Sequence, residues 1–224
     1  MTETINRQSP IQQLLADRRP EWMPQTELPL VLRFQDEAAE ESQMQRLGLC
    51  DFSGLSKLGL KGVEAGDWLR AQGVDVPDST YETRRLSDGG WIGCLGKNEY
   101  LLESSPSNKV VPELNRRLQS ESNRLLRVVR QDASFLLTGQ LAPDVLSQTC
   151  GVNFAEASPG RLILTRVAGV SCVVLPDFLG ESPTYRLWFD CSYAVYLWET
   201  LLEICAESGG DAIGAGVIIA ATLP

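Results

Sequence analysis

A stretch of about twenty residues occurs twice in this chain, and this repeat constrains the fold more than any other feature of the sequence. Leu58–Val76 reads LGLKGVEAGDWLRAQGVDV, and Phe135–Phe154 reads FLLTGQLAPDVLSQTCGVNF. With one residue inserted at Cys150, seven positions coincide: Leu60/Leu137, Gly62/Gly139, Ala65/Ala142, Asp67/Asp144, Leu69/Leu146, Gly73/Gly151 and Val74/Val152. Two copies about half a chain apart indicate a duplicated domain rather than a solenoid of short repeats.

Each copy predicts an apolar strand, a glycine and a short amphipathic helix. The strand ends at Gly62 or Gly139. Apolar residues then recur at helical spacing, which gives each helix one face to lay on a sheet. We expect Gly73 or Gly151 to end the helix in the left-handed conformation. Chance similarity between two strand–glycine–helix units is the alternative to duplication.

Both copies continue into strand-like runs and then a helix. The runs are Gly90–Leu95, Asn98–Glu103 and the helix Val110–Leu118 after the first copy, and Leu162–Val167, Ser171–Leu175, Thr184–Phe189 and the helix Cys191–Cys205 after the second. The last helix is predicted to bury one stripe, formed by Cys191, Ala194, Val195, Trp198, Leu201, Leu202 and Cys205. We therefore predict an α+β fold in which residues 46–224 form one domain with two strand-and-helix halves, about 47–122 and 123–215.

The two ends of the chain differ from this middle part. Residues 1–45 are rich in Pro, Gln, Glu and Arg and predict an arm, extended or partly ordered, with a short helix near Ile11–Leu15. The apolar tail Gly214–Leu223 is either an additional strand of the chain's own sheet or a segment ordered by a partner. Trp188 lies on the opposite strand face from Tyr185, so it is either covered by a neighbouring element or an interface anchor.

Composition excludes several classes of function. The formal charge is −9 and the pI about 4.7, which disfavours a nucleic-acid partner. The chain contains no histidine, so imidazole bases, Ser-His and Cys-His pairs and histidine-ligated metals are absent. One basic cluster is predicted to be a solvated face rather than an anion site: Arg116, Arg117, Arg124, Arg127 and Arg130.

The six cysteines are widely spaced, with no Cys-x-x-Cys pair, and are predicted to be buried thiols in a reducing compartment. No apolar segment follows Met1, and the uncharged run Ala212–Leu223 is shorter than the roughly 20 apolar residues of a membrane span. We expect a cytoplasmic protein without a membrane or metal site.

The first repeat and the residues before it carry a family motif. Residues 50–62, CDFSGLSKLGLKG, followed by Ala65 and Trp68-Leu69, resemble the opening of the folate-binding aminomethyltransferases, the family of the glycine cleavage T-protein. Later segments resemble a small branch of that family, the gamma subunit of heterotetrameric sarcosine oxidase: Gln131–Gly139, Thr165–Val170, Tyr185–Trp188 and Ser192–Glu199. The resemblance implies the T-protein folate-binding domain, with ferredoxin-like repeats and without the C-terminal β-barrel domain.

The resemblance also indicates what the chain lacks and what it retains. In the family, an acidic residue after a Gly-Gly-apolar-apolar step assists one-carbon transfer, but here Gly93 and Cys94 stand at that step. A thiol is a poor substitute for a carboxylate in proton transfer. A second family motif ends in a glutamate whose carboxylate binds the pterin ring. By this resemblance, Glu181 is the possible folate contact in this chain, with Tyr185 nearby. A loop glutamate in water is the alternative for Glu181.

These features predict a non-catalytic, gamma-type subunit that docks onto larger flavin-bearing oxidase chains. In the related complexes, those chains oxidatively demethylate an N-methyl amino acid, and the methyl group passes to tetrahydrofolate. No Gly-x-Gly-x-x-Gly flavin motif occurs in this sequence, and tetrahydrofolate is the one cofactor that the resemblance allows. The alternatives are a free-standing tetrahydrofolate-binding or aminomethyltransferase-like protein, and reuse of the fold for a structural or regulatory role.

Overall fold

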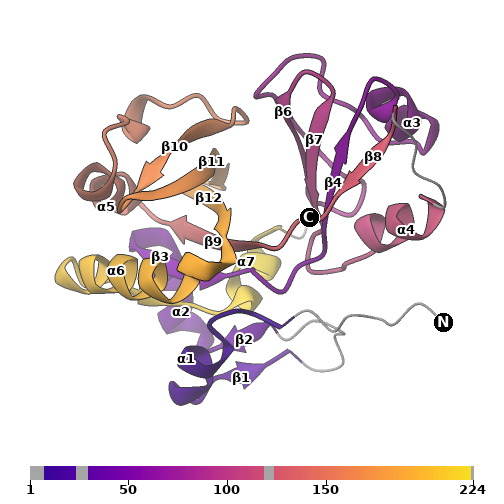
Figure 1. Cartoon of the computed structure of the whole chain (residues 1–224). Coiled ribbons are helices and arrows are strands. Elements are labelled where there is room, and N and C mark those ends of the chain that lie inside the picture. The colour runs from indigo at the N-terminus through magenta and orange to yellow at the C-terminus, as the bar shows by residue number, and fades with distance from the viewer. Residues whose placement is uncertain (1–7, 24–29, 119–123, 223–224) are drawn as a thin grey trace. The chain divides into compact units, whose positions relative to one another are not determined.

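The computed structural model describes residues 8–23, 30–118 and 124–222, which fold into two compact units (Figure 1). Unit 1 comprises the described residues within Met1–Gly54, Asp132–Pro159 and Ile163–Pro224. Unit 2 comprises those within Leu55–Gln131 and Gly160–Leu162. Each unit has its own sheet and its own hydrophobic core.

Unit 1 is built on a six-stranded sheet with the strand order β10-β11-β12-β9-β3-β13. The strands are β10 (Ile163–Val167), β11 (Val170–Leu179), β12 (Ser182–Asp190), β9 (Asp132–Thr138), β3 (Gly48–Asp51) and β13 (Asp211–Ala212). All neighbours are antiparallel except β13, which pairs parallel to β3. The strands β10 to β12 match the runs predicted after the second repeat.

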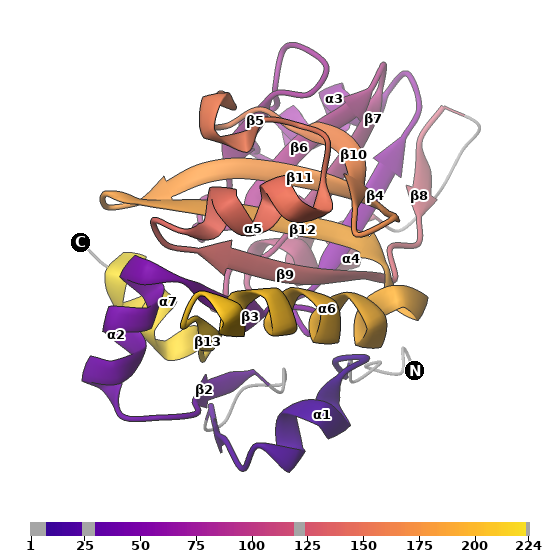
Figure 2. The ribbon, with the colours of Figure 1, turned by 90° about the vertical axis from the view of Figure 1, so that its left-hand side faces the viewer.

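Helices α5 (Ala142–Thr149) and α6 (Ala194–Glu207) lie on the same side of this sheet (Figure 2). The ring of Phe135 on β9 lies 4.9 Å from Phe189 and 5.2 Å from Trp198 of α6, measured between centroids. The buried residues of α6 are Ala194, Leu197, Trp198, Leu201 and Cys205. The prediction that Val195 is buried is wrong, because this side chain is 45% exposed. The buried stripe of α6 includes Leu197 instead. Val195 lies about 100° around the helix axis from the buried Ala194. Trp188 is buried, so it is not an exposed anchor.

The described part of the first 45 residues is folded in unit 1. It forms α1 (Gln12–Asp17), β1 (Glu21–Trp22), β2 (Val31–Arg33) and most of α2 (Glu37–Arg46), while residues 1–7 and 24–29 of the predicted arm lie outside the described residues. Ile11, Leu15 and Val31 are buried in the same core as Leu47. Asp36 begins α2 by accepting a hydrogen bond from the Ala39 backbone N–H at 3.0 Å.

The described part of the tail Gly214–Leu223 belongs to unit 1 as a helix, so the alternative of an additional strand is wrong; β13 ends before the tail, at Ala212. Ala215–Thr222 form α7, which packs against β2. The buried carboxylate of Glu40 accepts hydrogen bonds from the backbone N–H groups of Phe34 (2.6 Å) and Gly214 (2.9 Å). A Cβ on Gly214 would lie 2.1 Å from the Leu32 carbonyl oxygen, so this close approach requires glycine. Leu223 lies outside the described residues.

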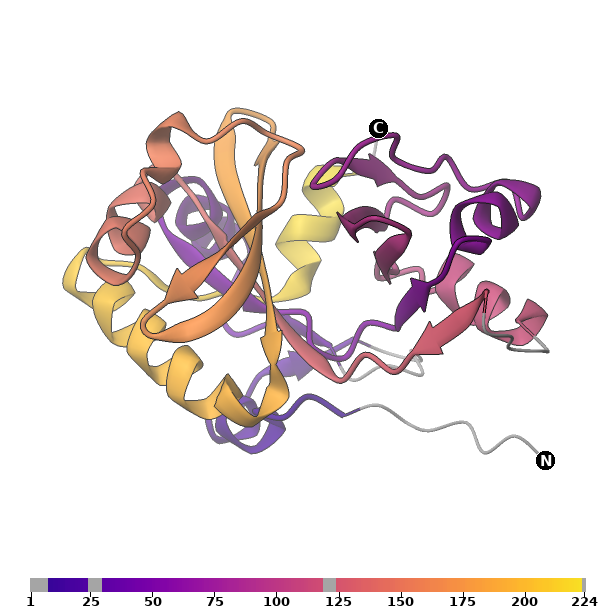
Figure 3. The same ribbon diagram turned by 45° about the horizontal axis from the view of Figure 1, so that its top comes forward.

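Unit 2 is built on a five-stranded antiparallel sheet with the order β5-β6-β7-β4-β8. The strands are β5 (Thr83–Arg85), β6 (Trp91–Gly96), β7 (Glu99–Glu103), β4 (Lys57–Lys61) and β8 (Leu126–Val128), of which β4 and β8 lie side by side in Figure 3. Helices α3 (Ala65–Ala71) and α4 (Val110–Arg117) contribute Leu69, Val111 and Leu114 to the core.

The two sheets have the same strand order when β4 is matched with β9. Strands β5, β6, β7 and β4 correspond to β10, β11, β12 and β9, and helices α3 and α4 correspond to α5 and α6. This confirms the predicted α+β class. On its other side, β4 of the first repeat pairs with β8, which comes just before the second repeat in the sequence. In the same way, β9 of the second repeat pairs with β3, which comes just before the first repeat.

Strands β4 and β9 end directly before Gly62 and Gly139, as predicted, and Gly73 has the predicted positive φ angle, at 82°. Gly62 and Gly139 also have positive φ angles, of 129° and 107°. The prediction for Gly151 is wrong, because Gly151 does not adopt a positive φ. The inserted Cys150 ends α5 in an extended conformation, and its thiol reaches the Thr165 hydroxyl at 3.3 Å.

Candidate functional site

Gly93 and Cys94, which stand where the family pattern has acids, lie within strand β6 of unit 2. A Cβ on Gly93 would lie 2.7 Å from Cδ1 of Leu162, so the leucine side chain fills the space into which a side chain at this position would project. The Cys94 thiol donates to the Gly96 carbonyl at 3.2 Å, and burial raises the pKa of this thiol. Neither position supplies a proton-accepting group at neutral pH.

Glu181 lies in the turn of the β11–β12 hairpin, in unit 1. The register pairs Leu179 with Ser182, which leaves Gly180 and Glu181 as the two turn residues, and Gly180 has a φ of 61°. The Glu181 side chain is exposed, while its backbone carbonyl accepts a hydrogen bond from Gln140 Nε2 at 3.1 Å. The turn is therefore tied to the end of β9, and the carboxylate stays in solvent.

A cavity of about 230 Å³ beside this turn brings Glu181 and Tyr185 together, and we call it the hairpin pocket. Its walls are mostly proline and aromatic, and the lining residues are Gln140, Pro143, Phe154, Ala155, Ala157, Pro159, Pro176, Asp177, Phe178, Glu181, Pro183 and Tyr185. No lysine or arginine is among them. Sequence reasoning found the two residues of the hairpin and missed the walls that α5 and the 3₁₀ turn Phe154–Glu156 provide.

Tyr185 forms part of the wall of the hairpin pocket. Its ring packs edge-on against Phe154, with 5.5 Å between centroids, and its hydroxyl donates to the Phe154 carbonyl at 3.3 Å. Burial raises the pKa of Tyr185, so the phenol stays protonated. While it donates to Phe154, this hydroxyl can accept a hydrogen bond from a ligand but cannot donate one.

The hairpin pocket is small, and its walls are mostly apolar. Its volume lies below the roughly 300 to 1,000 Å³ of typical small-molecule sites. Tetrahydrofolate as a whole does not fit a cavity of this size. One end of such a ligand would find the carboxylates of Glu181 and Asp177, the amide of Gln140 and otherwise mostly apolar walls. The folate contacts at Glu181 and Tyr185 remain predictions.

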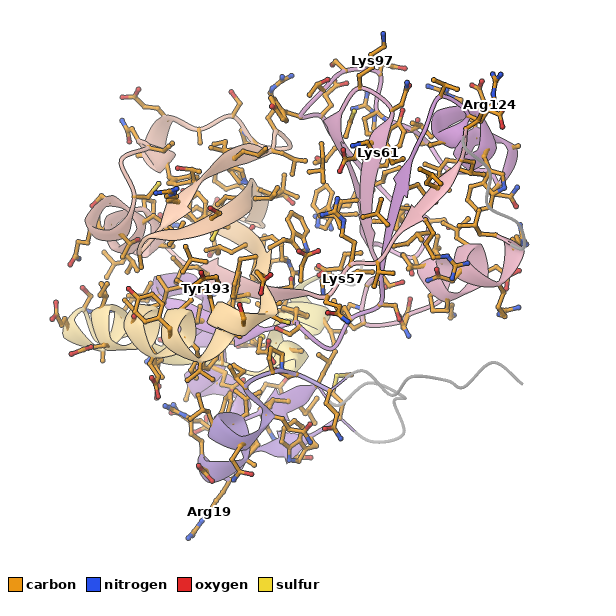
Figure 4. The ribbon with its side chains drawn as sticks, in the orientation of Figure 1. Arg19, Lys57, Lys61, Lys97, Arg124 and Tyr193 are labelled. Atoms are coloured by element: carbon orange, nitrogen blue, oxygen red, sulfur yellow. The ribbon has the colours of Figure 1, made fainter. Side chains whose placement is uncertain are left out.

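Sequence reasoning missed a buried ion pair in unit 2. Lys57 Nζ lies 3.1 Å from Glu103 Oε2, with 0% and 1% of the two side chains exposed, and it also donates to the Leu55 carbonyl at 3.2 Å. Lys57, which is labelled in Figure 4, opens β4, and Glu103 ends β7, where the register places the two residues opposite each other. Lys57 lies within the family motif, whereas no sequence pattern marks Glu103. Because both groups are buried, removal of either partner alone is expected to be strongly destabilising.

Four of the six cysteines are buried as predicted, whereas Cys150 and Cys191 are only partly buried. Burial raises the pKa of Cys172 and of Cys205 to about 12, so these two thiols are unreactive at neutral pH. The arginine cluster is engaged with neighbours, for example Arg117 with Glu113 at 2.7 Å and Arg130 with Glu99 at 3.3 Å. Across residues 8–23, 30–118 and 124–222, no three metal-ligating side chains gather, and none of the helices is both long and apolar enough to cross a bilayer.

Comparison of the sequence with protein-family models and with curated proteins finds no match. Two solved structures are similar in fold. Aminomethyltransferase T of the glycine cleavage system from Bartonella henselae superposes with a TM-score of 0.75 at 16% identity, over 93% of this chain and 59% of that one. The heterotetrameric sarcosine oxidase from Corynebacterium sp. U-96, in complex with pyrrole 2-carboxylate, superposes with a TM-score of 0.61 at 21% identity, over 90% of this chain and 95% of that one.

These similarities confirm that the chain has the T-protein-like fold that the sequence motifs implied. At 16% and 21% identity they establish the fold alone. The chain spans 59% of the length of the aminomethyltransferase.

Proposed function

We propose that this chain is a non-catalytic small subunit, of the gamma type, in a sarcosine-oxidase-like complex. Larger flavin-bearing chains of that complex would oxidatively demethylate an N-methyl amino acid, and the one-carbon unit would pass to tetrahydrofolate. The role of this chain would be to dock onto those subunits and hold the assembly together.

The environment of Gly93 carries this proposal. Leu162 fills the space that a side chain at this position would need, 2.7 Å from the place of a Cβ. The neighbouring thiol of Cys94 has a raised pKa and is hydrogen-bonded to a backbone carbonyl. One-carbon transfer needs a group that accepts a proton and stabilises a cationic intermediate, and neither residue can do this.

The extent of the structural similarity also supports the proposal. The match to the aminomethyltransferase covers 59% of that chain, whereas the match to the sarcosine oxidase chain covers 95% of it and 90% of this chain. Similarity along nearly the whole of both chains is expected for a subunit that occupies the same place in a related complex.

Purification from the native source, followed by mass spectrometry, tests the proposal. We expect the chain to co-purify with flavin-bearing oxidase subunits, and the isolated chain to show no turnover with an N-methyl amino acid and tetrahydrofolate. Purification as a stable, monodisperse protein without any companion would contradict it. So would folate-dependent turnover by the isolated chain.

A folate-binding protein is the second candidate, because the hairpin pocket brings Glu181 and Tyr185 together. Calorimetric titration with tetrahydrofolate tests it, with Glu181→Ala as the variant and Glu207→Ala, an exposed glutamate of α6, as the matched control. Saturable micromolar binding that is lost only in Glu181→Ala would favour this function. The absence of any binding heat would remove it.

A further inference from the structure

The first turns of α6 expose large hydrophobic side chains side by side. Tyr193, Val195 and Tyr196 are 51%, 45% and 51% exposed, and Figure 4 marks Tyr193 beside the helix. Scattered single hydrophobic residues are normal on a protein surface, but three within four consecutive positions form a patch. Tyrosines of this kind are enriched at the centres of protein interfaces.

This patch is held rigid by its surroundings in unit 1. The Tyr196 hydroxyl donates to the Ala168 carbonyl at 3.1 Å, in the two-residue turn Ala168–Gly169 that joins β10 to β11. The same turn is fixed to α5 by a 2.8 Å hydrogen bond from the Ala168 N–H to the Thr149 carbonyl. Asp190 caps the 3₁₀ turn before α6 by accepting from the Ser192 N–H at 2.9 Å. A rigid aromatic surface loses little conformational entropy on binding.

The charges that continue from this patch along α6 are unusual for a solvent-exposed helix. Glu199, Glu203 and Glu207 follow Val195 at intervals of four residues, so they form one exposed row. The helix contains no basic residue, and no ion pair joins these glutamates to any described residue. Like charges four residues apart repel each other, and acids near a helix C-terminus oppose the helix dipole. We call the set Tyr193, Val195, Tyr196, Glu199, Glu203 and Glu207 the α6 face.

We propose that the α6 face docks onto a basic surface of a partner polypeptide. The two tyrosines and Val195 would bury against apolar groups, and the glutamate row would face lysine or arginine side chains. This inference deepens the proposed function, since the partner would be one of the larger oxidase subunits. A second copy of this chain does not fit, because a two-fold contact through this face would oppose two acidic rows. A polyanion is excluded by the same charge.

The test uses the double variant Glu199→Lys/Glu203→Lys, with Glu37→Lys/Glu41→Lys on α2 as the matched control. Both pairs are exposed, spaced by four residues and changed by the same total charge. Each protein is titrated into the companion oxidase chains purified without it, at low and at high ionic strength. We expect the α6 variant to bind about 100-fold more weakly, with a smaller difference at high salt, and the control to bind within about threefold of the wild type.

Two further measurements separate docking from folding. The melting temperature of the free α6 variant is expected to be equal to or above that of the wild type. The double change turns the repulsion between positions 203 and 207 into an attraction, whereas positions 199 and 203 still carry like charges. Tyr193→Ser is expected to weaken assembly about tenfold or more, whereas Val129→Ser, at a side chain that is 76% exposed in unit 2, is not.

The outcomes distinguish this inference from the proposed function. If the wild type binds the companion chains and the α6 variants bind equally well, the inference is overturned and the proposed function stands. If the wild type binds none of them, both are overturned. Self-association of the isolated chain that the α6 variant abolishes would overturn the basic partner in favour of a second copy.

Discussion

The sheets of the two units have the same strand order, yet they differ in the side chains at one matched position. In unit 2, Lys57 at the start of β4 faces Glu103 at the end of β7 as a buried ion pair. The repeat alignment matches Lys57 with Ser134 of β9, and in unit 1 the register places Ser134 opposite Trp188 of β12. Both of these side chains are buried and uncharged. Backbone pairing has therefore been kept at this position, while one unit has a buried ion pair where the other has an uncharged pair.

The largest expected effect is the loss of the buried pair that distinguishes unit 2. Lys57→Met removes the ammonium group that pairs with the buried Glu103 carboxylate, and we expect a loss of about 3 to 5 kcal/mol in the free energy of unfolding. Lys61→Met is the control on the same strand, since Lys61 is 57% exposed and pairs with Glu99. That variant is expected to lose less than about 1 kcal/mol. Urea unfolding measures both, and equal losses would contradict a special role for the buried pair.

Lys57→Met/Glu103→Leu sharpens the same test. Replacing both partners removes the uncompensated charge, so we expect most of the stability lost in Lys57→Met to return. A double variant as unstable as the single one would mean that the two side chains act independently of each other.

The next largest expected effect on stability concerns a feature that the two units share, the glycine after the first strand of each repeat. A Cβ on Gly62 would lie 2.1 Å from the Arg124 carbonyl oxygen, and one on Gly139 would lie 2.4 Å from the Arg46 carbonyl carbon. Both glycines also have positive φ angles. We expect Gly62→Ala and Gly139→Ala to cost about 3 kcal/mol each, because backbone strain and steric overlap add. Tolerance of one substitution in urea unfolding would break the equivalence of the repeats.

A smaller effect on stability is expected at the glycine after each repeat helix, where the two repeats differ. Gly73 ends α3 with a φ of 82°, so Gly73→Ala is expected to cost about 1 kcal/mol. Gly151 has no positive φ, and nothing lies within 4 Å of a Cβ built there. Gly151→Ala is therefore expected to change the free energy of unfolding by less than about 0.5 kcal/mol. Thermal unfolding of the two variants provides the measurement, and equal losses would be the contrary result.

The smallest effect concerns pH. Hydrogen bonds from Ser192 lower the pKa of Asp190 in the folded protein. The stability that the ionised Asp190 contributes is therefore present above its unfolded pKa, about 4, and is lost as the pH falls through the lower folded pKa. We expect Asp190→Asn to lose less stability than the wild type between pH 7 and pH 3, measured as urea midpoints. Identical losses would show that Asp190 makes no contribution to the acid sensitivity of unit 1.

Local sequence patterns predicted most elements, because strand and helix periods depend on near neighbours. The runs after both repeats became strands β6, β7, β10, β11 and β12 and helices α4 and α6. The errors occurred where one residue or a distant segment decided the outcome. The inserted Cys150 removed the need for a left-handed Gly151, and β2 and Glu40, nearly two hundred residues earlier, accommodated the tail as α7.

For the candidate site too, the sequence predicted what lies close along the chain and not what distant segments contribute. Glu181 and Tyr185 lie in and near one tight turn, so the sequence brings them close to each other. The walls of the hairpin pocket come from Gln140, Pro143 and Phe154, which no local pattern connects to this turn. Glu103 was likewise invisible as a partner of Lys57, because strand register alone places it there.

The sequence by itself determined the α+β class, the strand–glycine–helix units and the absence of imidazole chemistry, since these depend on residue type and short-range spacing. Only the tertiary structure decided that β8 pairs with β4 and β3 with β9, that Lys57 and Glu103 are buried together, and that Leu162 fills the space beside Gly93. The physical reason is that strand pairing uses backbone groups that every residue carries. Period and polarity therefore mark a strand and its buried face, whereas the identity of its neighbour follows from how the whole chain packs.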